Sequence, residues 1–186
     1  MLITSLNDID KQVRLVRLAA ERTAQSMRHL LANEPDGLQI LKFIKFREIG
    51  HHPNDAIKLN VAEQANLTFT HLTTLEAAKW VISQHPDVLK QGVELNLGTD
   101  SGFDLQSAAD GLLAAKVFSA AQPKGNNKLG QATKHLSTRA ADTQHRYVFF
   151  SCPGFAAGRH PDLETVDGIS VWSFPPEQLL KYALSD

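Results

Sequence analysis

The chain has 186 residues, of which 42% are hydrophobic and 21% are charged, and its formal net charge at pH 7 is −1. This length allows one well-buried core and is short for two, so we expect a single domain. The near-neutral charge excludes a histone-like protein coated in basic residues, and no apolar run approaches the ~20 residues that span a bilayer.

The cellular compartment is indicated by cysteine usage and by the N-terminus. Cys152 is the single cysteine, so no intrachain disulfide can form. Met1 to Leu6 has neither a basic region nor a long apolar region, and we therefore expect no signal peptide. These features predict a cytoplasmic protein with no membrane partner.

The first half of the chain is predicted to be mainly helical. Ser5 and Asp8 form a capping-box-like start, and apolar residues then recur at helical spacing, which predicts a long helix over 6–33. The segment 38–46 alternates only loosely and fits either a helix or a strand. A loop over 50–55 and a helical stretch over 59–85, ended by the proline at 86, follow.

The second half carries most of the strand signals. Strands are predicted over 93–97, 103–107, 112–120, 146–151 and 168–174. A basic helix over 128–141 separates the third and fourth strands, with Asn126 or Asn127 as its N-cap, and a short helix begins at Pro175. This order predicts an α/β fold with a central mixed β-sheet flanked by helices.

The segment from Gly102 to Ser119 is predicted to form a β-hairpin. With Ala109 near the centre of its turn, residue 104 pairs near residue 114. Because side chains alternate between the two faces of a sheet, Asp104, Ala114 and Lys116 are expected on one face.

An acid and a lysine on adjacent strands are typical of metal-dependent nuclease sites. Asp104 is a candidate ligand for Mg²⁺ or Mn²⁺, and Lys116 is placed to orient a water molecule or to neutralise a phosphate. The second carboxylate of such a site belongs two residues before the lysine, where this chain has Ala114. One acid alone binds Mg²⁺ poorly.

The order of Glu63 on a helix, Asp104 on a strand and Ala114-Ala-Lys116 on the next strand resembles the restriction-endonuclease-like, or PD-(D/E)xK, superfamily. The resemblance covers about residues 58–151 and extends to a bacterial group within that superfamily. It implies a nuclease-like core, with Asp104, Lys116 and Glu63 as catalytic residues and Asp104 and Glu63 as metal ligands. Glu94 is a weaker candidate for the missing acid. The chain departs from the motif at Ala114, and no proline-aspartate pair precedes Asp104.

The stretch from Lys116 to Arg146 holds six lysines and arginines against one acid. This polarisation indicates either a solvated helix face or a surface that contacts phosphates. Under the second interpretation the nucleic-acid-binding residues are Lys124, Lys128, Lys134 and Arg139, and DNA is the expected partner.

Two hypotheses follow for the chain, divided into an N-terminal helical extension (1–57), a nuclease-like core (58–151) and a C-terminal strand and helix (152–186). In the first, the protein binds nucleic acid and either cleaves it with Mg²⁺ or Mn²⁺ or has lost cleavage at Ala114. In the second, it is a non-catalytic interaction protein, for which Asp104–Lys116 is a structural ion pair. The long N-terminal helix then forms a homodimer or docks another partner.

Overall fold

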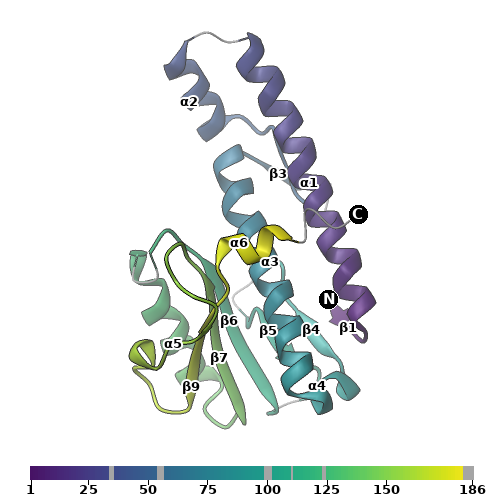
Figure 1. The fold of residues 1–186 in the computed structure, drawn as a ribbon, viewed down its shortest axis with the longest axis vertical. Helices are drawn as coiled ribbons and strands as arrows, with labels where there is room; N and C mark the ends of the chain where they lie inside the picture. The colour runs from purple at the N-terminus through teal and green to yellow at the C-terminus, as the bar shows by residue number, and fades with distance from the viewer. Residues whose placement is uncertain (34–35, 54–56, 99–101, 110, 123–124, 182–186) are drawn as a thin grey trace.

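The computed structural model describes residues 1–33, 36–53, 57–98, 102–109, 111–122 and 125–181. In this part of the chain a mixed seven-stranded sheet carries helices on both faces, and a helical arm projects beyond it (Figure 1). The strand order is β1-β4-β5-β6-β7-β9-β8. The strands are β1 (Leu2–Ile3), β4 (Val93–Leu95), β5 (Leu105–Ser107), β6 (Leu113–Ser119), β7 (His145–Ser151), β8 (Gly158–Arg159) and β9 (Ile169–Ser173). The predicted α/β class, mixed sheet and long N-terminal helix are confirmed.

Each face of the sheet has its own apolar core. The helices α3 (Val61–Gln84) and α4 (Pro86–Gln91) cover one face, and α5 (Lys128–Arg139) covers the other. Strand β6 supplies both cores by alternation, because Leu113, Ala115 and Val117 pack toward α3, whereas Ala114 and Phe118 pack toward α5. Any site on the α5 face is thus separated from α3 by the sheet.

The β5–β6 hairpin is present, but its register differs from the predicted one. Leu105 pairs with Ala115 and Gln106 with Ala114, so the hairpin is centred one residue later than Ala109. Asp104 therefore lies near Lys116 rather than opposite Ala114. The shift moves each partner by two residues, and a side-chain period of two leaves Asp104, Ala114 and Lys116 on the same face.

The crossover from β6 to β7 passes through α5 and makes the two strands parallel. The predicted N-cap position is occupied by Asn127, but its side chain makes no capping hydrogen bond. Asn126 and Asn127 both have left-handed backbones, with φ of 52° and 55°. Asparagine tolerates this conformation better than most residues, which explains how the chain turns sharply into α5 without glycine at either position.

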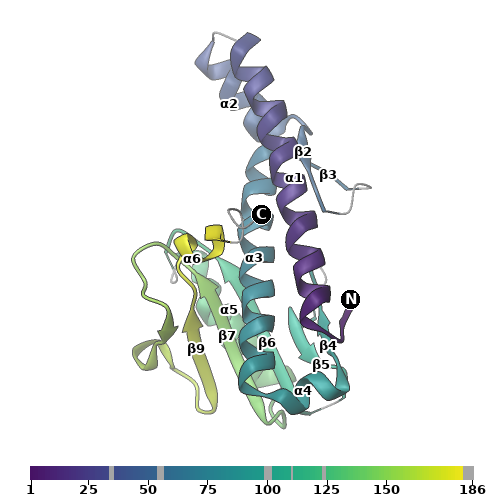
Figure 2. The same cartoon turned by 45° about the vertical axis from the view of Figure 1, so that its right-hand side comes forward.

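The arm consists of α1 (Leu6–Asn33), α2 (Gly37–Phe46) and the first turns of α3 (Figure 2). The segment that fitted either a helix or a strand is the helix α2, and the Asp36 carboxylate accepts a 2.9 Å hydrogen bond from the Leu38 N–H at its start. Where a loop was predicted over 50–55, β2 (Gly50–His51) pairs with β3 (Lys58–Leu59). The Thr23 hydroxyl of α1 accepts a hydrogen bond from the His51 N–H at 2.9 Å and holds this ribbon to the arm.

The remaining elements complete the two ends of the chain. β1 pairs with β4 and β8 with β9, so both outer strands of the sheet are only two residues long. Two turns of 3₁₀ helix, η1 (Gly125–Asn127) and η2 (Pro161–Leu163), and the short helix α6 (Pro176–Leu180) are also present. Among the described residues, no helix combines the length and apolarity needed to cross a membrane.

Candidate functional site

Asp104 and Lys116 form an ion pair at the open end of the β5–β6 hairpin. Lys116 Nζ lies 2.9 Å from Asp104 Oδ2, and the two side chains are only 21% and 17% exposed. The same carboxylate oxygen accepts a 2.7 Å hydrogen bond from the Val117 N–H. Lys116 Nζ also donates to the Gly102 carbonyl at 3.0 Å. The pair thus ties the strand entry before β5 to the second half of β6.

A cleft between β6 and α5 opens beside this ion pair. Its volume is about 340 Å³, and its polar lining comes from Lys116 on the sheet and from Lys128, Gln131 and His135 on the helix. Residues three, four and seven apart share one face of a helix, which is why these α5 side chains form a row. Arg139, four residues after His135, continues the row.

The electrostatics of the cleft are dominated by positive charge. Partial burial lowers the pKa of His135, and the charges of Lys116 and Arg139 lower it further, whereas Asp104 acts in the opposite direction. The edge of the His135 ring faces Phe103, with the centroids 5.3 Å apart. At neutral pH the row therefore presents cationic Lys116, Lys128 and Arg139 around a neutral imidazole.

The basic residues predicted to bind nucleic acid differ in their surroundings. Lys128 Nζ donates a 2.8 Å hydrogen bond to the Ser119 carbonyl and so holds α5 to the end of β6. Lys134 and Arg139 are exposed on α5. Lys124 lies outside the described residues. Two of the four side chains are consequently open to a ligand in solution.

Glu63 is not brought together with Asp104. It lies in the first turn of α3, and its carboxylate accepts a 3.2 Å hydrogen bond from the Asn60 N–H, while the Asn60 side chain accepts a 2.9 Å bond from the Glu63 N–H. This reciprocal pair is a capping box. Because α3 packs on the face of β6 opposite Lys116, the structure holds Glu63 away from the candidate metal ligand.

Replacing Glu63 with alanine is expected to lower the free energy of unfolding by about 0.5–1 kcal/mol, because one half of the capping box is lost. Urea denaturation would measure the loss. Calorimetric titration of Mn²⁺ is expected to give the same heat for this variant as for the unmodified protein. A loss of Mn²⁺ binding in the variant would assign Glu63 to a metal site.

The donor set around Asp104 does not fit Mg²⁺. That ion takes six oxygen ligands, commonly from one or two carboxylates together with water and phosphate. Here the Asp104 carboxylate is engaged by Lys116 and Val117, and Ala114 on the same face contributes no oxygen. A further acid on this face is Glu94 on β4, whose carboxylate accepts a 2.6 Å bond from the Gln106 amide. Among the described residues, no cluster of three or more metal-ligating side chains occurs.

Sequence reasoning missed His135 and Gln106. The signal for His135 was its position seven residues after Lys128, which places both on one face of a helix. Gln106 carried no such signal, because its relevance depends on pairing with Glu94 across two strands. Comparison with known proteins gave no match to any family model, curated protein or solved structure.

Proposed function

We propose that this protein binds nucleic acid, with DNA as the expected ligand, through the cleft between β6 and α5, and that it does so without metal-dependent hydrolysis. The observation that carries the proposal is the row of Lys128, His135 and Arg139 along one side of α5, which faces Lys116 on β6. Phosphate groups spaced along a strand are complementary to cations spaced along a helix. The stretch 116–146, which includes these residues, holds six lysines and arginines against one acid, whereas the rest of the chain is net acidic.

The order of elements supports a restriction-endonuclease-like core. Helix α3, the antiparallel strands β4, β5 and β6, helix α5 and the parallel strand β7 follow one another as that resemblance implies. Asp104 and Lys116 then stand where the acid and the lysine of the motif are expected.

Binding without hydrolysis follows from the chemistry of the pair. Phosphodiester hydrolysis by such sites uses a metal ion that activates water and neutralises developing charge. Asp104 is the one acid of the motif on this face, and it is already neutralised by Lys116 at 2.9 Å. We therefore propose that the pair has a structural role, and that the positive charge of the cleft comes from Lys128 and Arg139.

Reversing the charge of the two exposed cations is expected to weaken DNA binding. The double variant Lys134→Glu/Arg139→Glu is predicted to raise the dissociation constant for short fluorescein-labelled DNA on the order of tenfold, and to reduce the salt dependence by about one phosphate contact for each cation lost. Fluorescence anisotropy over a salt series would measure both. Lys128 is left intact because it holds α5 to β6.

A matched control is Arg28→Glu/Lys58→Glu, which reverses two exposed charges on α1 and β3, away from the cleft. Equal weakening by this variant would mean that only net charge matters and would refute the proposed surface. Absence of binding by the unmodified protein would favour the second hypothesis, a non-catalytic interaction protein. Cleavage with Mg²⁺ or Mn²⁺ that is abolished by Asp104→Ala would refute the loss of hydrolysis.

A further inference from the structure

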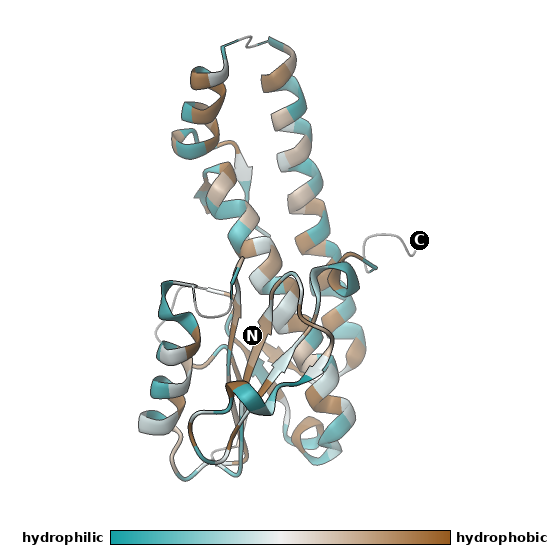
Figure 3. Cartoon of the chain, turned by 60° about the vertical axis from the view of Figure 1, so that its left-hand side comes forward, coloured by the Kyte–Doolittle hydropathy of each residue, from teal (hydrophilic) through white to brown (hydrophobic). Residues whose placement is uncertain are grey.

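The helix α2 is apolar in sequence but has no buried residue. Its sequence, Gly-Leu-Gln-Ile-Leu-Lys-Phe-Ile-Lys-Phe, holds six large hydrophobic residues in ten positions. Leu38 is 77% exposed, Leu41 61% and Phe46 74%, and Leu31 at the end of α1 is 51% exposed. The brown segments of α2 at the end of the arm are visible in Figure 3. Ile40, Phe43 and Ile44 are half-buried, so the uncovered side of α2 is the one that carries Leu38, Leu41 and Phe46.

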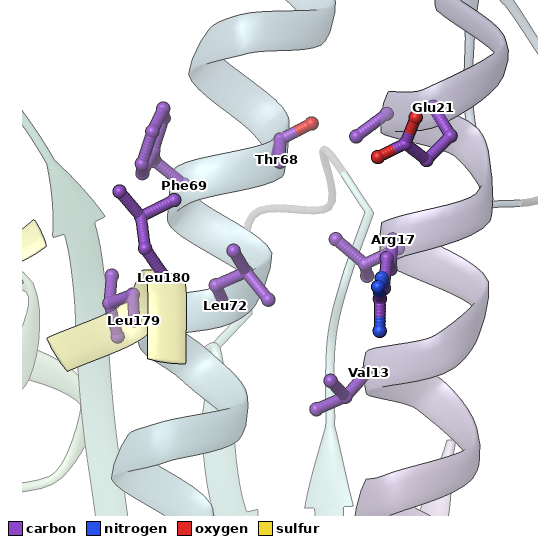
Figure 4. Close-up of a pocket in the computed structure, with 10 residues that line it drawn as sticks. Val13, Arg17, Glu21, Thr68, Phe69, Leu72, Leu179 and Leu180 are labelled. Carbon is purple, nitrogen blue, oxygen red and sulfur yellow. The ribbon is translucent and has the colours of Figure 1, made fainter. Parts of the chain in front are cut away.

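The same chain carries an apolar groove nearer the base of the arm. It has a volume of about 210 Å³ and lies between α1, α3 and α6, with Val13, Phe69, Leu72 and Leu179 among its walls (Figure 4). A cavity of about 150 Å³ is enough to hold a benzene ring, so this groove has room for a large apolar side chain. Its lining includes Arg17 and Glu21 from α1.

We propose that the occupant of this groove is α2 of a second copy of the chain, and that two copies exchange the contact reciprocally. Each copy offers both halves of the contact, so a two-fold arrangement satisfies both α2 helices and both grooves and closes without further growth. The groove lies roughly 20 Å along α1 from the C-terminal end of that helix, where α2 follows. The two arms therefore lie antiparallel in such a dimer.

The size of the apolar surface fits a second copy. The exposed parts of Leu31, Leu38, Leu41 and Phe46 amount to on the order of 500 Å², which equals the largest patches that monomers usually expose. A stable interface buries about 800 Å² on each partner. The patch of each copy supplies more than half of that area.

Charge at the two surfaces is complementary as well. Lys42 and Lys45 are exposed on α2, which contains no acid. Glu21 lines the groove. Glu177 precedes the groove-lining Leu180 by three residues, so these two residues lie on the same side of α6. Arg17 also lines the groove, so the groove and its rim carry two carboxylates against one guanidinium. The lysine pair on α2 of one copy therefore meets a net negative surface on the other.

Analytical ultracentrifugation of the full chain over a concentration series tests the proposal. The unmodified protein is expected to sediment as a dimer, and Leu38→Ser/Phe46→Ser is expected to raise the dimer dissociation constant by at least about 100-fold, as loss of central apolar contacts does. Leu2→Ser removes a leucine that is 54% exposed on β1, far from α2, so this control variant should remain dimeric. Circular dichroism confirms that each variant is folded.

Charge reversal identifies the contact itself. Variant A (Lys42→Glu/Lys45→Glu) and variant B (Glu21→Lys/Glu177→Lys) are each expected to be monomeric alone and to form a dimer when mixed, because the mixture restores opposite charges in both exchanged contacts. If variant B alone dimerises as well as the unmodified chain, α2 does not use this groove. A monomeric unmodified protein, or a dimeric Leu38→Ser/Phe46→Ser variant, would also overturn the proposal.

Discussion

Replacing Asp104 with alanine is expected to lower the free energy of unfolding by about 2–3 kcal/mol. The substitution removes the partner of the largely buried Lys116 ammonium and the acceptor of the Val117 N–H together. Both groups then lose an interaction that water replaces only in part, because the two side chains are about four-fifths buried. Urea denaturation followed by circular dichroism measures the loss.

A double-mutant cycle separates the ion pair from the hydrogen bond. Asp104→Asn keeps an oxygen acceptor for Val117 and loses the charge, so it is expected to cost less than Asp104→Ala. In the presence of Lys116→Met, Asp104→Ala is expected to cost about 1 kcal/mol less than it does alone, since the unpaired ammonium is then absent. A fully stable Asp104→Ala variant that had lost Mn²⁺ binding in calorimetry would instead make this carboxylate a metal ligand.

Acidification is expected to destabilise the base of the arm through His71. Burial lowers the pKa of this imidazole from 6.5 to about 4, with a further decrease from neighbouring His52 and a small opposing effect from the Leu97 backbone. The two rings meet edge to face, with centroids 5.4 Å apart, and His71 is only 2% exposed. Protonation therefore places a charge where solvent cannot reach it.

The direction of this pH effect follows from proton binding. Below pH 6.5 the unfolded chain binds a proton at His71 and the folded chain does not, so stability is fully present above pH 6.5 and is lost as the pH falls toward 4. The expected loss between pH 7 and pH 4.5 is about 2–3 kcal/mol. Urea denaturation at several pH values measures it.

The variant His71→Gln isolates this contribution, because the lowered pKa values of Asp8, Asp87 and Glu164 add a pH dependence that both proteins share. The difference in stability between the unmodified protein and His71→Gln should shrink as the pH falls from 7 to 4.5. His29→Gln, at an exposed position on α1, is the control for replacing a histidine outside the core. A constant difference for His71→Gln would show that this ring is protonated alike in both states.

Local patterns in the sequence were sufficient for most elements of the fold. Capping residues predicted the starts of α1 and α5. Alternation predicted β4, and short apolar runs bounded by turn residues predicted the strands β5 to β7 and β9. The meeting of Asp104 and Lys116 was also predictable, although the register was wrong by two residues. Side-chain direction repeats every two residues along a strand. The predicted face of Asp104 and Lys116 was therefore correct, although every predicted residue pair was wrong.

The two-residue strands β1 and β8 carried too few residues for any periodicity, and they exist because a longer strand offers them an edge. Gln106, near the Asp104–Lys116 pair, was equally beyond local prediction, because its role depends on a hydrogen bond to Glu94 on the neighbouring strand. Short elements and cross-strand partners are decided by contacts between distant segments, which no local pattern records.

The amino-acid sequence by itself determined the α/β class, the positive charge near α5 and the shared face of Asp104 and Lys116, because each depends on residues close together in the chain. Only the tertiary structure decided that Glu63 lies away from Asp104, on the α3 side of the sheet, that Lys128 is held by the Ser119 carbonyl and that α2 has no buried side chain. Those outcomes depend on the direction in which a helix crosses the sheet and on which other elements pack against that helix. Both are set by packing between elements, where burial of apolar surface outweighs local preference.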